Sequence, residues 1–312
     1  MLTTDHIAIL APRIEHLIKR AGAATLEVFN APGELEVTTK ADASPVTIAD
    51  HRAHQIIMEG LNRLAADLRQ PSHGEGDEGR SALMAATAAL VEHLPVLSEE
   101  AALQSFEERQ SWTTYWLIDP LDGTREFVSG NGEYTINIAL IHNHEPVAGW
   151  VYAPVQATLY SGWRMQDSAA AFRERDGQKT VIHTRLPDRP GAQGIDVVAS
   201  RRHGTDALAP IMEKAGELFS EVRTTNVGSS LKICLLAAGE ADWYPRLAPT
   251  SEWDTAAADA VLRGAGGIMV DTSHVPLRYN TGDSILNPHF HAFSCDHAVW
   301  RELLGQDSVS GI

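Results

Sequence analysis

The chain has 312 residues, of which 44% are hydrophobic, and 41 acidic side chains against 25 Lys and Arg give a net charge of −16. A chain of this length buries about three quarters of its surface on folding, so neither a metal nor a disulfide is needed merely to hold a core together. The negative charge argues against a non-specific binder of nucleic-acid polymers and against binding to anionic membranes, since such binding requires Lys and Arg to neutralise phosphates.

The first third of the chain is predicted to be mainly helical. Apolar residues recur at three- and four-residue spacing over residues 7–28 and again over residues 47–68, which predicts two amphipathic helices. An alternation of apolar and polar residues predicts a strand at 35–40. Residues 70–81 are rich in Gly and acidic side chains and are interpreted as an exposed loop, followed by an alanine-rich helix over residues 81–94.

The rest of the chain begins with closely spaced predicted strands and continues with alternating strands and helices. Closely spaced strands are expected at residues 115–118, 134–142, 147–152, 157–163 and 169–173. After the turn-rich residues 186–194, strands at 195–199 and 221–224 alternate with helices at 206–214, 230–239 and 254–263. We therefore predict an α+β lobe over residues 1–186 and an α/β lobe over residues 187–312. The two cysteines, Cys234 and Cys295, stand in apolar runs and are expected to be buried thiols.

The most informative motif is Asp119-Pro-Leu-Asp122-Gly-Thr124, at the end of an apolar strand. Two carboxylates on one tight turn repel each other unless a cation lies between them, and hard oxygen ligands suit Mg²⁺. The Gly and Thr that follow open what is predicted to be a short helix, whose start suits a phosphate. Taken alone, Asp-x-x-Asp-Gly is also a common turn composition.

Three further segments carry acidic or hydroxyl side chains. They are Leu-Ser-Glu99-Glu100, the segment around Asp254 in Trp-Asp-Thr-Ala, and Lys-Ala-Asp-Ala-Ser-Pro-Val-Thr-Ile-Ala-Asp50. Each has an ordinary interpretation by itself, as a solvated loop or a helix cap. Together, in this order, the four segments resemble the inositol monophosphatase superfamily of Mg²⁺-dependent, lithium-sensitive phosphatases. Its two signatures are similar to WLIDPLDGTREFVSG, residues 116–130, and WDTAAADAVLRGAGG, residues 253–267.

The resemblance implies a layered α-β-α-β-α sandwich, with the metal site between two lobes. It places one Mg²⁺ on Glu99, Asp119 and the backbone carbonyl of Leu121, and a second on Asp119, Asp122 and Asp254. It implies further that Thr124, hydrogen-bonded to Asp50, orients an attacking water while Glu99 helps to accept its proton. The amides of Gly123 and Thr124 are then expected to hold the phosphate.

Within the superfamily, strings such as NGEYTINIALI, GSSLKICLLAAGEADWYPR and SILNPHF resemble 3'(2'),5'-bisphosphate nucleotidases of the CysQ type. This resemblance implies removal of the 3'-phosphate of 3'-phosphoadenosine 5'-phosphate to give AMP, in sulfate assimilation. It suggests Ser229, Lys232, Arg246 and His203 as contacts of the nucleotide. Two departures are an apparent insertion at residues 70–93 and Arg202 in place of a small residue.

Rival interpretations remain open from the sequence. An inositol-1-phosphate phosphatase would share every metal ligand. A haloacid-dehalogenase-type phosphotransferase is disfavoured because its motif, Asp-x-Asp-Gly-Thr, has a different spacing and lies near the amino terminus. A non-enzymatic acidic scaffold that binds divalent cations would not require four convergent segments.

No signal peptide or apolar stretch of about 20 residues is visible, so we expect a cytoplasmic protein with a small-molecule substrate. Peripheral contact at the inner membrane face is left open.

Overall fold

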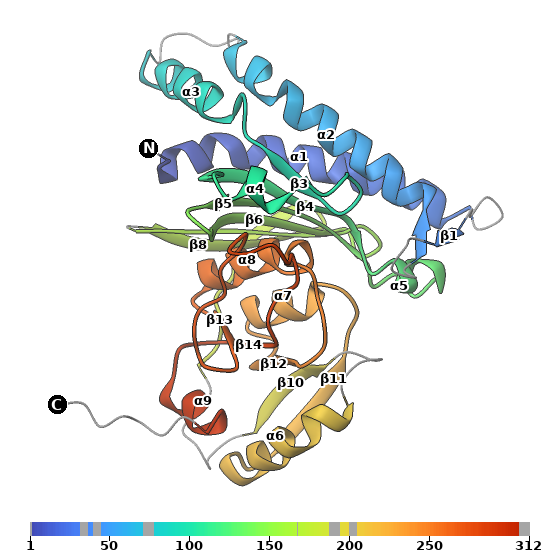
Figure 1. Ribbon diagram of the computed structural model, residues 1–312, viewed down its shortest axis with the longest axis vertical. Coiled ribbons are helices and arrows are strands. Elements are labelled where there is room, and N and C mark those ends of the chain that lie inside the picture. Colours follow the sequence, from blue (N-terminus) through green and yellow to red (C-terminus); the bar gives the residue numbers. More distant parts are fainter. Residues whose placement is uncertain are drawn as a thin grey trace.

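The structure is a computed structural model that describes residues 2–31, 37–39, 45–70, 78–166, 168–186, 194–199 and 205–305. Its elements form five layers (Figure 1): helices, a seven-stranded sheet, helices, a five-stranded sheet and helices again. This arrangement confirms the expected α-β-α-β-α sandwich. Among the helices of the described ranges, none combines the length and the apolar character needed to cross a bilayer.

The outermost layer consists of α1 (Thr4–Phe29), α2 (Ile48–Arg69) and α3 (Glu78–Val91). The apolar stripes predicted from the sequence are the buried faces of the first two helices. One prediction was wrong here: α3 begins at Glu78, so residues 78–81 are helical and not loop, and the helix ends at Val91 rather than at residue 94. Residues 71–77 lie outside the described part of the chain.

Part of the strand expected at residues 35–40 is present in a small hairpin. Strands β1 (Val37–Thr39) and β2 (Pro45–Thr47) pair antiparallel, and the second strand leads directly into α2. Residues 32–36 and 40–44 are not described, so the first part of the segment that ends at Asp50 lies outside the described residues.

The seven-stranded sheet runs in the order β3 to β9. Only β3 and β4 pair in parallel, and the remaining neighbours form an antiparallel meander. Its strands are β3 (Val96–Ser98), β4 (Thr114–Asp122), β5 (Thr135–His142), β6 (Glu145–Ala153), β7 (Thr158–Met165), β8 (Ser168–Arg175) and β9 (Gln178–Val181). The short helices α4 (Phe106–Arg109) and α5 (Thr124–Val128) precede and follow β4.

Both faces of this sheet are buried. On β4, Trp116 and Ile118 pack toward the outer helices, whereas Tyr115 and Leu117 belong to the core on the opposite face. A strand that is buried on both faces has an almost continuous apolar sequence. The sequence of β4 therefore does not show the alternation of apolar and polar residues that marks a half-buried strand.

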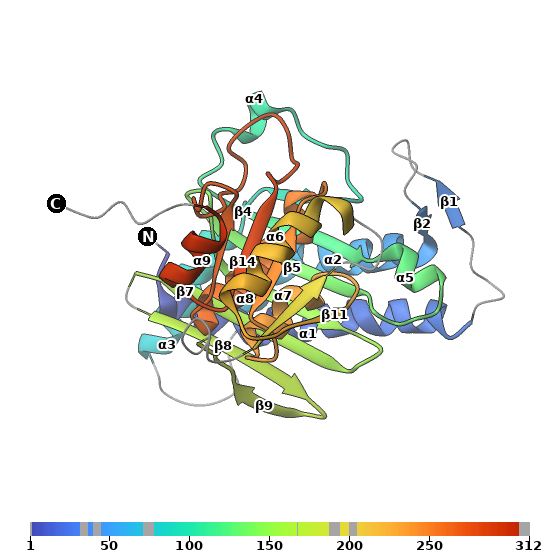
Figure 2. The same ribbon diagram turned by 90° about the horizontal axis from the view of Figure 1, so that it is seen from below.

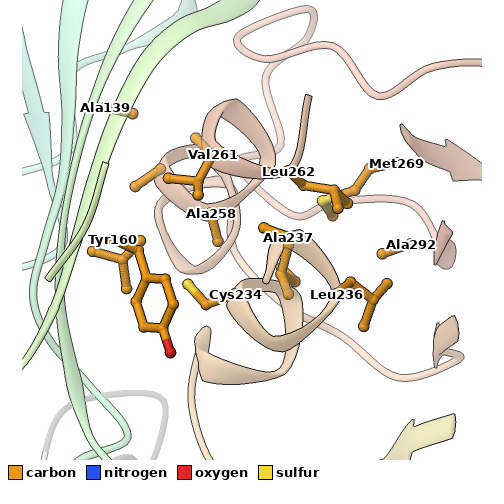
Figure 3. Packing of buried hydrophobic residues seen from close by; sticks show 14 of the residues in the cluster. Ala139, Tyr160, Cys234, Leu236, Ala237, Ala258, Val261, Leu262, Met269 and Ala292 are labelled. Atoms are coloured by element: carbon orange, nitrogen blue, oxygen red, sulfur yellow. The ribbon is translucent and has the colours of Figure 1, made fainter. Parts of the chain in front are cut away.

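The central layer consists of α7 (Leu231–Ala237) and α8 (Ala256–Ala265), held between the two sheets. Figure 3 shows Val261 and Ala258 of α8 and Cys234 of α7 directed toward Ala139 and Tyr160 of the large sheet. Small residues allow this close approach: a Cβ on Gly149 would lie 2.1 Å from the carbonyl oxygen of Ala257. Both cysteines are buried, as predicted.

The five-stranded sheet has the order β11-β10-β12-β14-β13, and α6 (Thr205–Leu218) and α9 (Ala298–Leu303) form the last layer. Its strands are β10 (Ile195–Ala199), β11 (Val222–Asn226), β12 (Trp243–Arg246), β13 (Ile268–Asp271) and β14 (Phe290–Phe293). The last three strands, each of four residues, were not predicted, because so short a run carries almost no periodic signal. The large sheet ends at Val181 and the small sheet begins at Ile195; the division of the chain into lobes at residue 187 stays a prediction.

Candidate functional site

A bulge in β4 places two carboxylates on one face of the large sheet. Asp119 pairs with Asn137 and Asp122 pairs with Thr135, so three steps along β4 oppose only two steps along β5. Residues three apart in a regular strand point to opposite faces, and the one extra residue of a bulge restores the same face. The Asp-Pro-Leu-Asp spacing therefore brings its two acids together.

Two more acids reach this pair from separate elements. One carboxylate oxygen each of Asp119, Asp122 and Asp254 lies within 4.8 Å of the other two. Asp254 ends the 3₁₀ helix η2 (Glu252–Asp254), where the backbone N–H of Ser251 donates to its Oδ2 at 2.9 Å. Glu99 follows β3, the parallel neighbour of β4, and its side chain interacts with that of Asp119.

Without a cation, burial makes it energetically costly for the carboxyl groups of this cluster to be ionised. Burial and the charges of its acidic neighbours raise the pKa of Asp119 and the pKa of Asp254 well above their ordinary values. Burial also raises the pKa of Asp122 to about 6, against the opposing effects of Lys232 and the Ser230 N–H. Like charges held together in a low-dielectric site favour a cation between them, and an all-oxygen donor set suits a hard divalent ion. The residues therefore fit a divalent-metal site.

Thr124 and Asp50 meet beside the cluster, although they are 74 residues apart. The Thr124 hydroxyl donates to Asp50 Oδ1 at 3.3 Å and lies 3.4 Å from the carbonyl oxygen of Leu121. Asp50 is held in turn by Thr47, whose backbone N–H and hydroxyl donate to Oδ2 at 2.8 and 2.7 Å. Burial raises the pKa of Asp50 to about 6.

Gly123 makes the sharp turn from β4 into α5. Its φ of 94° lies in the left-handed region, where a side chain would be strained. The turn brings the start of α5 against the segment 227–230: an added Cβ on Gly123 would lie 3.5 Å from Cβ of Ser229. Gly123 and Ser229, both predicted to contact substrate, are thus neighbours in space.

A cavity of about 140 Å³ opens between the start of α5, the segment 227–233 and the segment 250–255. Asp122 and Asp254 form part of its wall, so the cavity is continuous with the acidic cluster. Three cations, Arg125, Lys232 and Arg246, also line it. A cavity lined both by carboxylates and by these three cations, here called its cationic side, can bind an anion next to a metal.

The two predicted cations in the cavity are held in different ways. Lys232 is 6% exposed, and its Nζ donates to the carbonyl oxygens of Ser229 at 2.6 Å and Val227 at 3.2 Å. Burial lowers its pKa to about 8, which Asp122 opposes. Arg246 donates from Nε and Nη2 to the carbonyl oxygens of Ala248 and Pro249.

The structure thus brings together every predicted site residue that it describes. His203 lies outside the described residues. Three charged residues near the cavity were not predicted as site residues: Arg125 and Glu126 in its wall, and Glu133, whose Oε2 accepts the Gly228 N–H at 2.7 Å. All three lie inside strings that carry the family resemblance, so they could have been considered from the sequence.

Comparisons with known proteins agree with this geometry. The model of the inositol monophosphatase family matches residues 10–304. The chain is 41% identical to a 3'(2'),5'-bisphosphate nucleotidase CysQ of Escherichia coli K12 over 274 residues, which cover 88% of this chain and 95% of that protein. It is 32% identical to the protein of that name from Haemophilus influenzae, over 86% and 88% of the two chains.

Solved structures also match the fold of this chain. The crystal structure of CysQ from Bacteroides thetaiotaomicron matches with a TM-score of 0.68 at 33% identity and covers 89% of this chain and 94% of that one. An inositol monophosphatase from Anabaena matches with a TM-score of 0.64 over 97% of both chains, but at 20% identity it shows the fold alone.

Proposed function

This chain belongs to the inositol monophosphatase family, and from that premise we propose that it is a Mg²⁺-dependent 3'(2'),5'-bisphosphate nucleotidase. The proposed reaction is hydrolysis of the 3'-phosphate of 3'-phosphoadenosine 5'-phosphate to AMP and phosphate, a step that recycles the by-product of sulfate assimilation. The observation that carries the proposal is the acidic cluster that opens into a cavity lined by three cations. The names of relatives at 41% identity support the choice of a bisphosphate nucleotide.

The residues that would hold Mg²⁺ are those of the acidic cluster. We assign Glu99, Asp119 and the Leu121 carbonyl to one ion, and Asp119, Asp122 and Asp254 to another. When bound, the ions supply positive charge that offsets the phosphate and lower the pKa of coordinated water. The raised pKa values of the cluster agree with this assignment, because a divalent ion removes the repulsion that raises them.

Thr124, Asp50 and Glu99 are assigned to the attacking water. Because Thr47 fixes Asp50, the Asp50 carboxylate fixes the direction in which the Thr124 hydroxyl donates its proton. The Thr124 oxygen can then accept a hydrogen bond from a water and orient it toward phosphorus. Glu99, at the edge of the same cluster, is the candidate to accept a proton from that water. The backbone N–H groups of Gly123 and Thr124 are the candidates to hold the phosphate oxygens.

The substrate's second phosphate is assigned to the cationic side of the cavity. Ser229 and Arg246 are candidate contacts for the 5'-phosphate and ribose. Lys232 contributes its positive charge while its ammonium group donates hydrogen bonds to carbonyl oxygens of the segment 227–230. An inositol monophosphate lacks a second phosphate and would leave this positive charge without a partner.

The experiment compares turnover of 3'-phosphoadenosine 5'-phosphate, adenylyl sulfate 3'-phosphate and inositol 1-phosphate under identical conditions, with and without Mg²⁺. We expect the adenosine 3',5'-bisphosphate to be hydrolysed with the highest kcat/KM, and EDTA to abolish activity. A clear preference for inositol 1-phosphate would refute the nucleotide assignment while leaving the family and the metal site in place.

A further inference from the structure

Arg109 is a fully buried arginine outside the acidic cluster and outside the wall of the cavity. It ends α4, and its exposed fraction is 0%. Its guanidinium donates to the carbonyl oxygens of Gln104 at 3.1 Å, Gly282 at 3.2 Å and Asp283. Desolvating a guanidinium is expensive unless its donors are paired, so these bonds tie the α4 segment firmly to the segment 280–283. In Figure 2, α4 lies beside the loop that leads to β14.

Asn280 carries this connection further. Arg109 Nη1 donates to Asn280 Oδ1 at 2.6 Å, and Asn280 Nδ2 donates back to the backbone carbonyl oxygen of Arg109 at 2.6 Å. Asn280 is fully buried and its φ is 56°, a left-handed conformation that Asn tolerates better than most residues. Arg109 therefore holds the Asn280 side chain at both its amide oxygen and its amide nitrogen.

The backbone of Asn280 contacts the helix that carries a metal ligand. Its N–H lies 2.8 and 2.9 Å from the two carboxylate oxygens of Glu252, which is 4% exposed. The N–H of Glu252 donates to the carbonyl oxygen of Ile285, in the same loop, at 2.8 Å. Glu252 is the first residue of η2, and Asp254 is the last. A short 3₁₀ helix has few hydrogen bonds of its own, so its position depends on such external contacts.

We propose that Arg109 is a positioning residue for the metal site, which acts through Asn280 and Glu252 to fix the helix η2 that presents Asp254. The inference rests on the proposed function only in taking Asp254 as a metal ligand. Arg109 does not belong to the acidic cluster; it contributes through the loop that holds Glu252. Groups that orient a metal ligand without touching the ion commonly change metal affinity 10–100-fold when removed.

The experiment measures Mn²⁺ binding to the whole protein by calorimetry without substrate, so that it does not depend on which phosphate ester is hydrolysed. Asn280→Gly keeps the left-handed backbone and its N–H to Glu252, and removes only the amide that Arg109 holds. Glu252→Ala removes the next link. Each variant is expected to bind Mn²⁺ about tenfold more weakly or worse. At saturating metal, kcat should recover and KM for the nucleotide should stay close to that of the wild type.

Arg185→Lys is the matched control. Arg185 donates to Asp242, which precedes β12, and to Asp196 of β10, so this change disturbs a partly buried arginine network that does not include η2. It should lower the unfolding temperature and leave Mn²⁺ affinity unchanged. Folded Asn280→Gly and Glu252→Ala variants that bind Mn²⁺ like the wild type would overturn the inference. A wild-type protein that binds Mn²⁺ but hydrolyses no bisphosphate nucleotide would refute the proposed function and leave this inference standing.

Discussion

The backbone N–H of Ser230 lies 2.6 Å from Oδ2 of Asp122. This bond joins the residue that precedes α7 to the metal-ligand candidate at the end of β4, so the cation-lined wall of the cavity is attached directly to the acidic cluster. The Ser230 hydroxyl reinforces the connection: it is 2.8 Å from Thr135 Oγ1 and 2.9 Å from Asn137 Oδ1, both on β5. Ser230 thus connects the segment 227–230 both to a metal-ligand candidate and to β5.

Ser230→Ala keeps the backbone N–H that Asp122 accepts and removes the hydroxyl. Because Thr135 and Asn137 are buried, each loses a partner that water cannot replace. We expect the free energy of unfolding to fall by about 1–3 kcal/mol, measured by urea denaturation. Ser129→Ala, at an exposed hydroxyl that only contacts the carbonyl oxygen of Glu126, should change it by less than about 0.5 kcal/mol. Equal effects of the two changes would contradict this account of Ser230.

Asp119→Asn removes one charge from the buried cluster with almost no change in shape. Without metal, the variant should unfold at a higher temperature than the wild type, since the repulsion that raises the pKa of Asp119 is relieved. With Mg²⁺ the order should reverse, and phosphatase activity should fall by more than about a hundredfold. Differential scanning fluorimetry in EDTA and in Mg²⁺ measures the unfolding temperatures of both proteins in each condition.

Asp176→Asn is the control for this change of charge. Asp176 is exposed, in the turn between β8 and β9, and its φ of 53° is one that Asn also adopts. It should leave the unfolding temperature unchanged in both conditions. If Asp119→Asn lowers stability in EDTA, the cluster is not electrostatically strained.

Asp50 predicts a pH dependence of stability for the metal-free protein. Burial raises its pKa from 3.8 to about 6, so the folded state binds this proton more tightly than the unfolded state. Its contribution to stability is therefore fully present below pH 3.8 and is lost as the pH rises through about 6. Asp50→Asn cannot titrate, and its unfolding free energy should fall less than that of the wild type between pH 4 and pH 7 in EDTA. Parallel curves for the two proteins would be inconsistent with the raised pKa.

Local patterns were sufficient to predict the long helices, because the apolar stripes of α1 and α2 follow from helical spacing. The members of the acidic cluster were predicted from the resemblance of four segments to one family, since each segment alone has an ordinary interpretation. The bulge in β4 could not be predicted in this way. A spacing of three residues suggests opposite faces of a strand, and the extra residue is recognisable only from the register with β5.

Features that depend on distant partners escaped the sequence analysis. The strands β12, β13 and β14 are short and exist because they pair with each other, so nothing in their own residues distinguishes them from loops. The role of Arg109 depends on Asn280, 171 residues away. The orientation of Lys232 toward the carbonyl oxygens of Val227 and Ser229 is likewise decided by the fold, whereas its charge was evident from the sequence.

The different attachments of Arg246 and Lys232 predict different consequences of removing each cation. Arg246→Gln removes a charge whose guanidinium donates to the carbonyl oxygens of Ala248 and Pro249. KM for the 3',5'-bisphosphate should rise about tenfold, with little change for adenosine 3'-phosphate, because only the former carries the second phosphate. Steady-state kinetics with both substrates checks this, and exposed Arg164→Gln controls for the overall charge. Lys232→Met also leaves the carbonyl oxygens of Val227 and Ser229 without their donor, so it should raise KM for both substrates and lower stability as well. If Arg246→Gln impairs both substrates equally, the 5'-phosphate does not bind at the cationic side of the cavity.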